Sequence, residues 1–185
     1  MSVDLKHIRQ VLDEADCLYT GEQIEDAIKK MGRQITAELA DSNPLIYCVM
    51  NGGLVLTGKL LTEMPFPLEA SYVHATRYRH QLTGDELDWK VRPAQDMTGR
   101  TVLILDDILD EGHTLDAIAD FCKGQGASRV LTAVLINKIH NRKARPDMKA
   151  DFSGLDIGDR YIFGYGLDYQ GYWRNANGIF ALKGH

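Results

Sequence analysis

The spacing of apolar residues changes along this chain, and each spacing predicts a different element. Within residues 20–40, six apolar side chains recur every three or four positions, which places them on one face of a helix: Ile24, Ala27, Ile28, Met31, Ile35 and Leu39. Thr20 and Gln23 have the spacing of a capping box, in which side chains satisfy free N–H groups at a helix start. The pattern therefore predicts a helix over 20–40.

Four other segments have the composition of β-strands: residues 43–50, 69–78, 101–105 and 129–137. All but 69–78 are almost continuously apolar and rich in β-branched residues. Such runs are typical of strands that are buried on both faces of a sheet. We therefore expect a sheet with both faces covered.

Helical segments are expected between these strands. Residues 54–61 follow the glycine turn Gly52-Gly53, and 114–126 carry apolar residues at helical spacing before a glycine stop. Strands that alternate with helices predict an α/β fold, in which a parallel sheet is flanked by helices and ligands bind at the carboxyl ends of the strands. The turns at Gly52-Gly53 and at Gly112 both fall at such ends.

Two segments do not follow this alternation. Residues 79–100 are polar and contain Gly84, Pro93 and Gly99, so we expect a long loop with some hairpin character. The last stretch, 159–182, is dense in aromatic and turn residues and is expected to form a small hood over the sheet edge. We expect one domain over 1–185, with a core of about 20–150. The hood is expected to consist mainly of about 151–185 and to include N-terminal residues as well.

Composition excludes several classes of protein. The chain has 185 residues, of which 44% are apolar and 25% charged, as expected for one globular domain. A net charge of -5 without a Lys/Arg block argues against nucleic acid and anionic membranes as partners. The polar N-terminus predicts no signal peptide, and the three cysteines lack metal-binding spacing. We expect a cytoplasmic protein with idle thiols.

The stretch "VLILDDILDEGHTL", residues 102–115, carries the main chemical signal. Four acids follow an apolar strand within six positions: Asp106, Asp107, Asp110 and Glu111. The N–H groups that begin the next helix favour an anion such as phosphate. Acids beside a phosphate require hydroxyl groups and a divalent cation, so we expect a sugar phosphate with Mg²⁺. The alternative is an acidic surface loop with a helix cap.

This stretch resembles the signature of phosphoribosyltransferases that use phosphoribosyl pyrophosphate. "VMNGG" (49–53) is similar to their pyrophosphate loop, and "RYIFGYGLDYQGYWRN" (160–175) resembles the hood of hypoxanthine-guanine phosphoribosyltransferases. With "LINKIHNRK" between them, the likeness extends from about Leu18 to Leu182. It implies a type I phosphoribosyltransferase core with a small hood.

The resemblance implies roles for the acidic residues. Asp106 and Asp107 would hold the ribose hydroxyls and order the metal shell, and Asp110 would be the catalytic general base or proton partner at the purine N7. The 5′-phosphate would be bound by the loop of Asp110, Glu111, Gly112, His113 and Thr114. The pyrophosphate would be bound by the loop of Met50, Asn51 and Gly52. Thr114 would also donate its hydroxyl group.

Further residues would contact the base and the leaving group. Lys138 would donate to the 6-oxo group, Tyr161 would stack on the purine, and Ile162 would offer backbone contacts. Asp168 would bind Mg²⁺ and Arg174 would meet the pyrophosphate. A lysine has donors only, so it suits a 6-oxo purine better than adenine.

Plainer roles stay open for these same residues. Lys138 is alternatively a solvated charge, and Tyr161 an ordinary core aromatic residue. Asp168 alternatively caps a turn, and Arg174 pairs with a nearby acid.

The chain departs from the family pattern at three places. Glu111 replaces a hydroxyl residue of the phosphate loop, where a protonated His113 would partly compensate the added charge. Asn51 stands where lysine is common. Arg77 and Tyr78 stand where relatives carry Ser-Tyr in a mobile loop, so closure over the reacting centre is expected for residues 77–90, with an ordinary flexible hairpin as the alternative.

The predicted function is purine salvage by a Mg²⁺-dependent glycosyltransferase. Hypoxanthine or guanine and phosphoribosyl pyrophosphate would give IMP or GMP and pyrophosphate, and the resemblance implies a homo-oligomer, a dimer or tetramer. One alternative is a regulator that senses phosphoribosyl pyrophosphate and binds nucleic acid, against which the charge of -5 weighs. Another is the same reaction on xanthine or on a pyrimidine.

Overall fold

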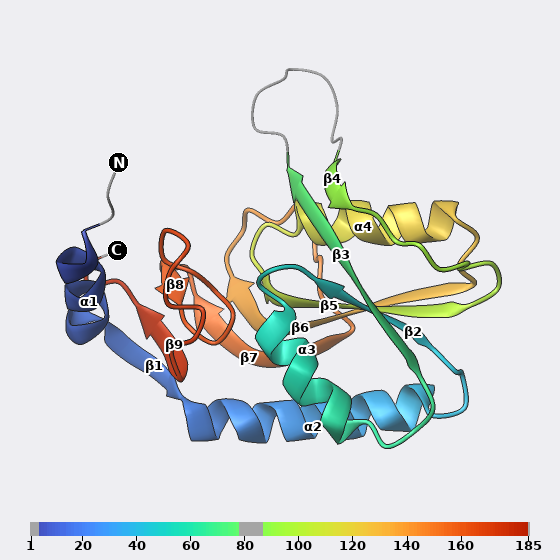
Figure 1. The fold of residues 1–185 in the computed structure, drawn as a ribbon, viewed down its shortest axis with the longest axis horizontal. Helices are drawn as coiled ribbons and strands as arrows, with labels where there is room; N and C mark the ends of the chain where they lie inside the picture. The colour runs from blue at the N-terminus through green and yellow to red at the C-terminus, as the bar shows by residue number, and fades with distance from the viewer. Residues whose placement is uncertain (1–3, 78–86, 185) are drawn as a thin grey trace.

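A six-stranded sheet forms the centre of the computed structural model, which describes residues 4–77 and 87–184. Its strand order is β4-β3-β2-β5-β6-β7, and all neighbours are parallel except β3 and β4 (Figure 1). The strands are β2 (Leu45–Val49), β3 (Glu69–Arg77), β4 (Leu87–Val91), β5 (Thr101–Leu109), β6 (Arg129–Ile139) and β7 (Phe152–Gly158). The predicted α/β class is confirmed.

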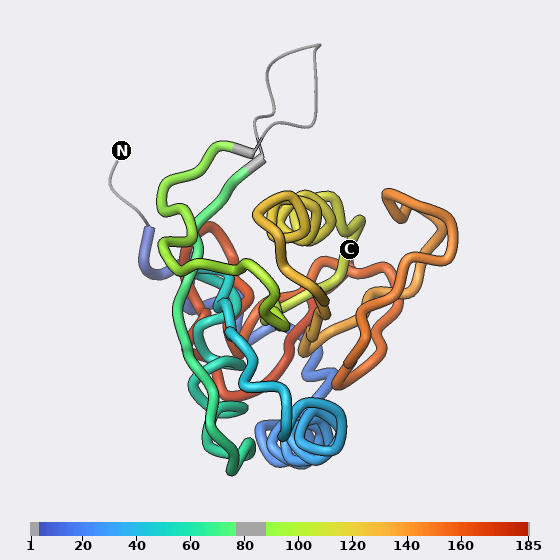
Figure 2. The backbone as a smooth tube through the Cα atoms, turned by 90° about the vertical axis from the view of Figure 1, so that its right-hand side faces the viewer, coloured from blue at the N-terminus to red at the C-terminus, as the bar shows by residue number. Residues whose placement is uncertain are grey.

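Helices cover both faces of this sheet, as Figures 1 and 2 show from two directions. On one face lie α2 (Gly21–Leu39) and α3 (Leu54–Leu60), which runs into a 3-10 turn at Leu61–Glu63, and on the other lies α4 (His113–Gly124). Side chains of β5 alternate between the two cores, because Leu103 packs with the α2 side and Ile104 with the α4 side. The sheet is therefore buried on both faces, as predicted.

Helix α2 begins where the sequence predicted. The Thr20 hydroxyl accepts a hydrogen bond from the Gln23 N–H, and the Gln23 side chain accepts one from the Thr20 N–H. This reciprocal pair is the capping box inferred from spacing.

A second, smaller sheet forms the hood. It contains β1 (Asp16–Thr20), β9 (Gly178–Ala181) and β8 (Ile162–Phe163), in that order and antiparallel. Helix α1 (Leu5–Glu14) joins it, since the Trp173 indole N–H donates to the Ile8 carbonyl at 2.6 Å. In the described parts of the chain, every helix is too short or too polar to span a membrane.

The main sheet extends further along the chain than the apolar runs predicted. β5 continues through the acidic pair to Leu109, because Asp106 and Ile108 still pair with β6. β7 pairs with β6 beyond the boundary of about 151 that the sequence suggested, so the C-terminal hood strands β8 and β9 begin only after Gly158. Within 79–100, Leu87–Val91 forms a strand antiparallel to β3, which agrees with the expected hairpin character.

Candidate active site

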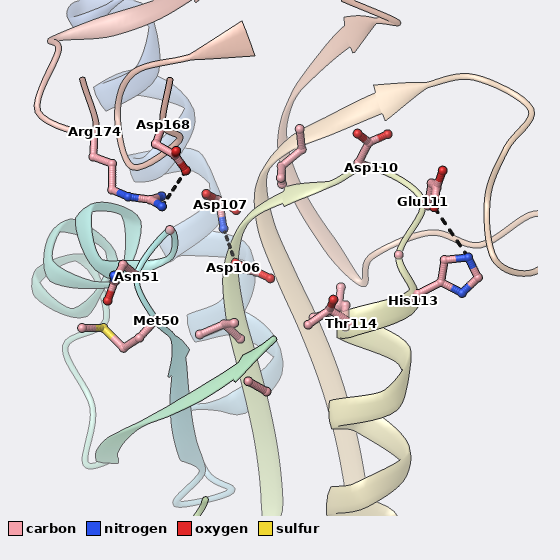
Figure 3. A pocket seen from close by; sticks show the side chains of 16 residues that line it. Met50, Asn51, Asp106, Asp107, Asp110, Glu111, His113, Thr114, Asp168 and Arg174 are labelled. Atoms are coloured by element: carbon pink, nitrogen blue, oxygen red, sulfur yellow. Dashed lines mark hydrogen bonds and ion pairs between the residues drawn. The ribbon is translucent and has the colours of Figure 1, made fainter. Parts of the chain in front are cut away.

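A cavity of about 960 Å³ lies at the carboxyl ends of β2 and β5 (Figure 3). Twelve of the residues that the sequence singled out line it: Met50, Asn51, Gly52, Asp106, Asp107, Asp110, Glu111, Gly112, His113, Thr114, Asp168 and Arg174. They come from the turn after β2, the end of β5, the start of α4 and the hood. The fold thus gathers three separate motifs around one space.

The acidic pair stands at the end of β5. Asp106 is 9% exposed, and its Oδ1 accepts a hydrogen bond of 2.9 Å from the Asp107 N–H. Burial and the adjacent Asp107 charge raise the pKa of Asp106 well above its usual value, and burial also raises the pKa of Asp107. Two crowded carboxylates in this position favour a ligand that brings a cation or hydroxyl donors.

The turn after β2 approaches this pair closely. A Cβ atom on Gly52 would lie 2.0 Å from Asp107 Oδ2, so a side chain there would displace the carboxylate. The preceding peptide bond between Met50 and Asn51 is cis. The close approach of residue 52 to Asp107 thus requires glycine if the carboxylate is to keep this position.

The loop before α4 turns at Gly112, which has φ of +90°. This left-handed conformation favours glycine, and a Cβ atom would lie 2.5 Å from the Met148 sulfur. Helix α4 starts at the next residue, and the first N–H groups of a helix have no partner within it. Glu111 is exposed, and its carboxylate lies 3.7 Å from the His113 ring, so a protonated His113 would compensate the added charge.

The hood contributes an ion pair to the cavity. Arg174 lies 2.5 Å from Asp168, whose other oxygen accepts from the Gly171 N–H, and Arg174 also donates to the Gly166 carbonyl. The plainer roles considered for these two residues, a turn cap and a partner for an acid, are thus both present. Both side chains nevertheless line the cavity (Figure 3).

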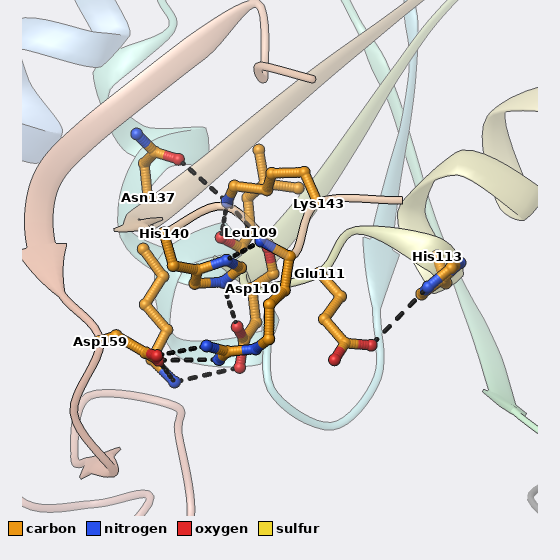
Figure 4. Close-up of polar contacts among 10 residues, drawn as sticks. Leu109, Asp110, Glu111, His113, Asn137, His140, Lys143 and Asp159 are labelled. Carbon is orange, nitrogen blue, oxygen red and sulfur yellow. Dashed lines mark hydrogen bonds and ion pairs between the residues drawn. The ribbon is translucent and has the colours of Figure 1, made fainter. Parts of the chain in front are cut away.

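Asp110 is held by a cluster of basic side chains (Figure 4). Lys138 Nζ donates to one carboxylate oxygen at 3.1 Å, and His140 Nε2 lies 2.7 Å from the other. Burial raises the pKa of Asp110, but the hydrogen bonds from His140 and Lys138 and the Lys138 charge outweigh it, so the pKa falls below its usual value. Lys138 is 9% exposed and contacts Asp159 as well, which argues against a solvated charge.

Sequence reasoning missed the other members of this cluster. Lys143 Nζ donates to the carbonyl oxygens of Leu109 and Asp110, each at 2.7 Å. Arg142 forms two hydrogen bonds with Asp159. The only sequence signal was the density of basic residues in "LINKIHNRK", which does not say which of them face Asp110.

Three predicted residues, Lys138, Tyr161 and Ile162, are not among those that line this cavity. Tyr161 is 46% exposed on the hood and packs edge-on against Tyr169, and Ile162 is buried in β8. Neither is among the cavity-lining residues, so their contact with a base stays a prediction. Arg77 ends β3, whereas Tyr78 and most of the 77–90 loop lie outside the described residues.

The predicted metal ligands, Asp168, Asp106 and Asp107, border one cavity but do not form a cage. Within residues 4–77 and 87–184, no three His, Cys, Asp or Glu side chains are grouped closely enough to hold an ion. A metal at this site would need ligands from a substrate or from water.

Comparison with known proteins finds relatives that match most of the chain. The family model of the phosphoribosyl transferase domain matches residues 14–170. The hypoxanthine-guanine phosphoribosyltransferase of Bacillus subtilis is 31% identical over 173 residues, covering 90% of this chain and 92% of that protein. Its Streptococcus pneumoniae R6 counterpart is 31% identical over 168 residues, with the same coverage.

Solved structures of related enzymes have the same fold. A hypoxanthine phosphoribosyltransferase from Staphylococcus aureus superposes with a TM-score of 0.85 at 25% identity, covering 99% of this chain and 97% of that one. A hypoxanthine-guanine-xanthine phosphoribosyltransferase superposes with a TM-score of 0.77 at 27% identity, covering 93% and 97%.

Proposed function

The chain belongs to the hypoxanthine-guanine phosphoribosyltransferase family of purine salvage enzymes, and we propose that it transfers the phosphoribosyl group of phosphoribosyl pyrophosphate to hypoxanthine or guanine. The observation that carries this proposal is the single cavity shared by the acidic strand end, the glycine turn after β2 and the hood pair Asp168–Arg174. These are the parts needed for a sugar, its 5′-phosphate and its pyrophosphate leaving group.

The reaction replaces one bond at C1′ of the ribose. N9 of the base forms a bond to C1′ while the bond from C1′ to pyrophosphate breaks, and its electron pair leaves with the pyrophosphate. The base gives up the proton on N7, which Asp110 accepts. A lowered pKa keeps Asp110 ionised near neutral pH, so it is ready to take that proton. Its side chain is 42% exposed, which leaves the carboxylate accessible from the cavity.

The remaining residues bind the two charged ends of the sugar. The N–H groups at the start of α4, with the Thr114 hydroxyl, would bind the 5′-phosphate. Asp106 and Asp107 would accept hydrogen bonds from the ribose hydroxyls. Arg174 and the turn at Met50–Gly52 would bind the departing pyrophosphate, whose negative charge grows as the bond breaks.

The oxygen donors of this cavity suit Mg²⁺. Mg²⁺ usually takes one or two carboxylates together with water and substrate phosphates, and Asp106, Asp107 and Asp168 offer carboxylates that face the same space. The raised pKa of the buried pair Asp106 and Asp107 also indicates a position that a cation would stabilise. When bound, Mg²⁺ would neutralise charge on the pyrophosphate.

Base selection is assigned to Lys138. Its ammonium group only donates, so it matches the 6-oxo group of hypoxanthine, guanine or xanthine and opposes the amino group of adenine. Xanthine remains a candidate substrate because one structural relative, 27% identical, acts on it by name. Tyr161 and Ile162 would complete the base site when a purine is bound.

Two wider expectations belong to this proposal. We place the reaction in the cytoplasm, where free thiols such as those of Cys17, Cys48 and Cys122 persist. We also propose a homo-oligomer, a dimer or tetramer, which sedimentation of the purified chain would test.

The testing experiment measures nucleotide formation from phosphoribosyl pyrophosphate with hypoxanthine, guanine, xanthine and adenine in parallel, with Mg²⁺ and with chelator. We expect Mg²⁺-dependent turnover of the 6-oxo bases, with adenine at least about a hundredfold slower because its amino group leaves Lys138 opposed by another donor. The asparagine variant Asp110→Asn is the matched control, since it keeps the shape but not the basicity.

Either of two results would contradict the proposal. If adenine were converted as fast as hypoxanthine, Lys138 would not select the base. Binding of phosphoribosyl pyrophosphate without turnover of any base would favour the sensing regulator instead.

A further inference from the structure

We propose that His140 is a positioning residue for Asp110, one that holds this carboxylate in place while Lys138 moves to the purine. The inference rests on the proposed function, because it assigns Asp110 and Lys138 to the base site. It concerns a side chain that lies two positions beyond Lys138, just after β6 ends.

The hydrogen bonds of His140 determine the position of its proton. Its Nδ1 accepts a hydrogen bond of 3.0 Å from the Arg142 backbone N–H, a group that can only donate. Nδ1 is therefore unprotonated, and the ring proton lies on Nε2, from which it is donated to Asp110 Oδ1 at 2.7 Å. The His140 side chain is 3% exposed, so water does not compete for this bond.

The Lys138 ammonium group is needed by two hydrogen-bond acceptors. It donates to Asp110 Oδ2 at 3.1 Å, and the proposed function requires it to donate to the 6-oxo group of the base. It also lies 3.5 Å from Asp159, which holds it near the site when it turns away from Asp110. His140 carries no such second duty, so its hydrogen bond can persist when a purine binds.

The backbone beneath Asp110 is fixed by the same segment. Lys143 Nζ donates to the Leu109 and Asp110 carbonyl oxygens, and the Ala144 N–H donates to the Glu111 carbonyl at 2.7 Å. Residues 140–144 thus hold both the main chain and the side chain of Asp110, as Figure 4 shows. Among the described residues, the hydrogen bonds to the carboxylate itself come from His140 and from Lys138.

Several titratable groups lie around Asp110, and the hydrogen bonds from His140 and Lys138 favour its ionised form. β6 and the loop after it carry Lys138, His140, Arg142 and Lys143. The loop after β7 carries Asp159, which contacts Lys138. Glu111 and His113 lie close to Asp110 along the chain. A donor to the carboxylate stabilises its ionised form. Removing the His140 donor should therefore raise the pKa of Asp110. A smaller fraction of this carboxylate is then ionised at acidic pH and able to accept the N7 proton.

The test compares two substitutions that differ in one donor. His140→Gln keeps an N–H near the position of Nε2, whereas His140→Leu has a similar size and no donor. For the leucine variant we expect kcat with hypoxanthine to fall by about tenfold or more, the acidic limb of the pH profile to move up by about one pH unit, and KM for phosphoribosyl pyrophosphate to stay within about twofold. His140→Gln should recover most of kcat and the wild-type limb.

A second measurement reads the His140 tautomer in the wild-type protein itself. Nitrogen-15 NMR of the wild-type protein, with the His140 signal assigned by its loss in His140→Gln, should show a proton on Nε2 and none on Nδ1 near neutral pH. A protonated Nδ1 would overturn the geometry on which the inference stands.

The outcomes separate this inference from the proposed function. If the wild-type protein converts hypoxanthine but His140→Leu keeps its rate and pH limb, His140 has no positioning role. Equal losses in the leucine and glutamine variants, with an unmoved pH limb, would make His140 a packing residue. If the wild-type protein converts no base at all, the proposed function itself fails.

Discussion

At the scale of single residues, the shape of the cavity depends on two glycines, which have no side chain. Gly52 touches the Asp107 carboxylate so closely that a Cβ would lie 2.0 Å from one oxygen. Gly166, with φ of +111°, approaches the Gly52 carbonyl from the hood, where a Cβ would lie 2.4 Å from that oxygen. These contacts bring the turn after β2, the acidic pair and the hood within reach of one ligand.

Replacing Gly52 with alanine should damage the site without unfolding the protein. The new methyl group must push the Asp107 carboxylate out of its place, so we expect kcat/KM for phosphoribosyl pyrophosphate to fall by about tenfold or more. Steady-state kinetics would measure this, with thermal unfolding as a check on the fold.

Gly58→Ala provides the matched control. Gly58 lies in α3, where a Cβ would have no atom within 4 Å. Alanine there should raise the free energy of unfolding by about 0.5–1 kcal/mol and leave kinetics unchanged. Equal kinetic effects at both positions would refute the argument from close approach.

At the scale of elements, the junction between β1 and α2 links the hood to the core. Thr20 ends the hood strand and caps the helix, which then packs Ile24, Ile28 and Met31 against the sheet. The cap matters because the first N–H groups of a helix otherwise lose their partners.

Thr20→Ala should therefore lower the free energy of unfolding by about 1 kcal/mol. For a chain of this size we expect a melting temperature about 2–4 °C lower, measured by calorimetry. Thr20→Ser keeps the accepting hydroxyl and should remain close to wild type. An alanine variant as stable as the serine variant would show that the capping box contributes nothing measurable.

At the scale of the whole molecule, the hood is tied to the core by polar contacts. The Tyr165 hydroxyl donates to Glu25 of α2, and Lys59 of α3 pairs with the same carboxylate at 2.8 Å. The hydrogen bond from Lys59, followed by that from Tyr165, lowers the pKa of Glu25 from its ordinary value. A second tie runs from the Tyr19 hydroxyl to the Asp156 carbonyl at 2.8 Å.

Tyr165→Phe should destabilise the protein in a pH-dependent way. Because the folded pKa of Glu25 is lowered, the stabilisation is complete above the unfolded pKa and is lost as the pH falls through the folded pKa. We expect a loss of about 1 kcal/mol near neutral pH, at the low end for a bond to a carboxylate that remains partly exposed. Urea unfolding of the two proteins over a falling pH series would measure it.

Tyr19→Phe is the matched control for this series. Its lost partner is a neutral carbonyl, so its cost should not follow the ionisation of Glu25. A cost of Tyr165→Phe that is equally constant with pH would show that Glu25 does not take part in the tie.

Local pattern was sufficient for the central elements. The strand at Thr101, the acidic cluster up to Glu111, the glycine turn and α4 are contiguous, so period and spacing alone indicate them. The capping box of α2 was predictable for the same reason. The ends of strands were harder to predict, because Asp106 and Ile108 belong to β5 through their pairing with β6.

The sequence by itself determined which residue types follow each strand, and hence the class of chemistry, because strand ends, turns and helix starts are encoded by neighbours in the chain. Only the tertiary structure decided which distant groups meet there. His140 faces Asp110, and Tyr165 reaches Glu25. These contacts depend on how strands pair and how the hood packs against the core, and no local spacing specifies that geometry.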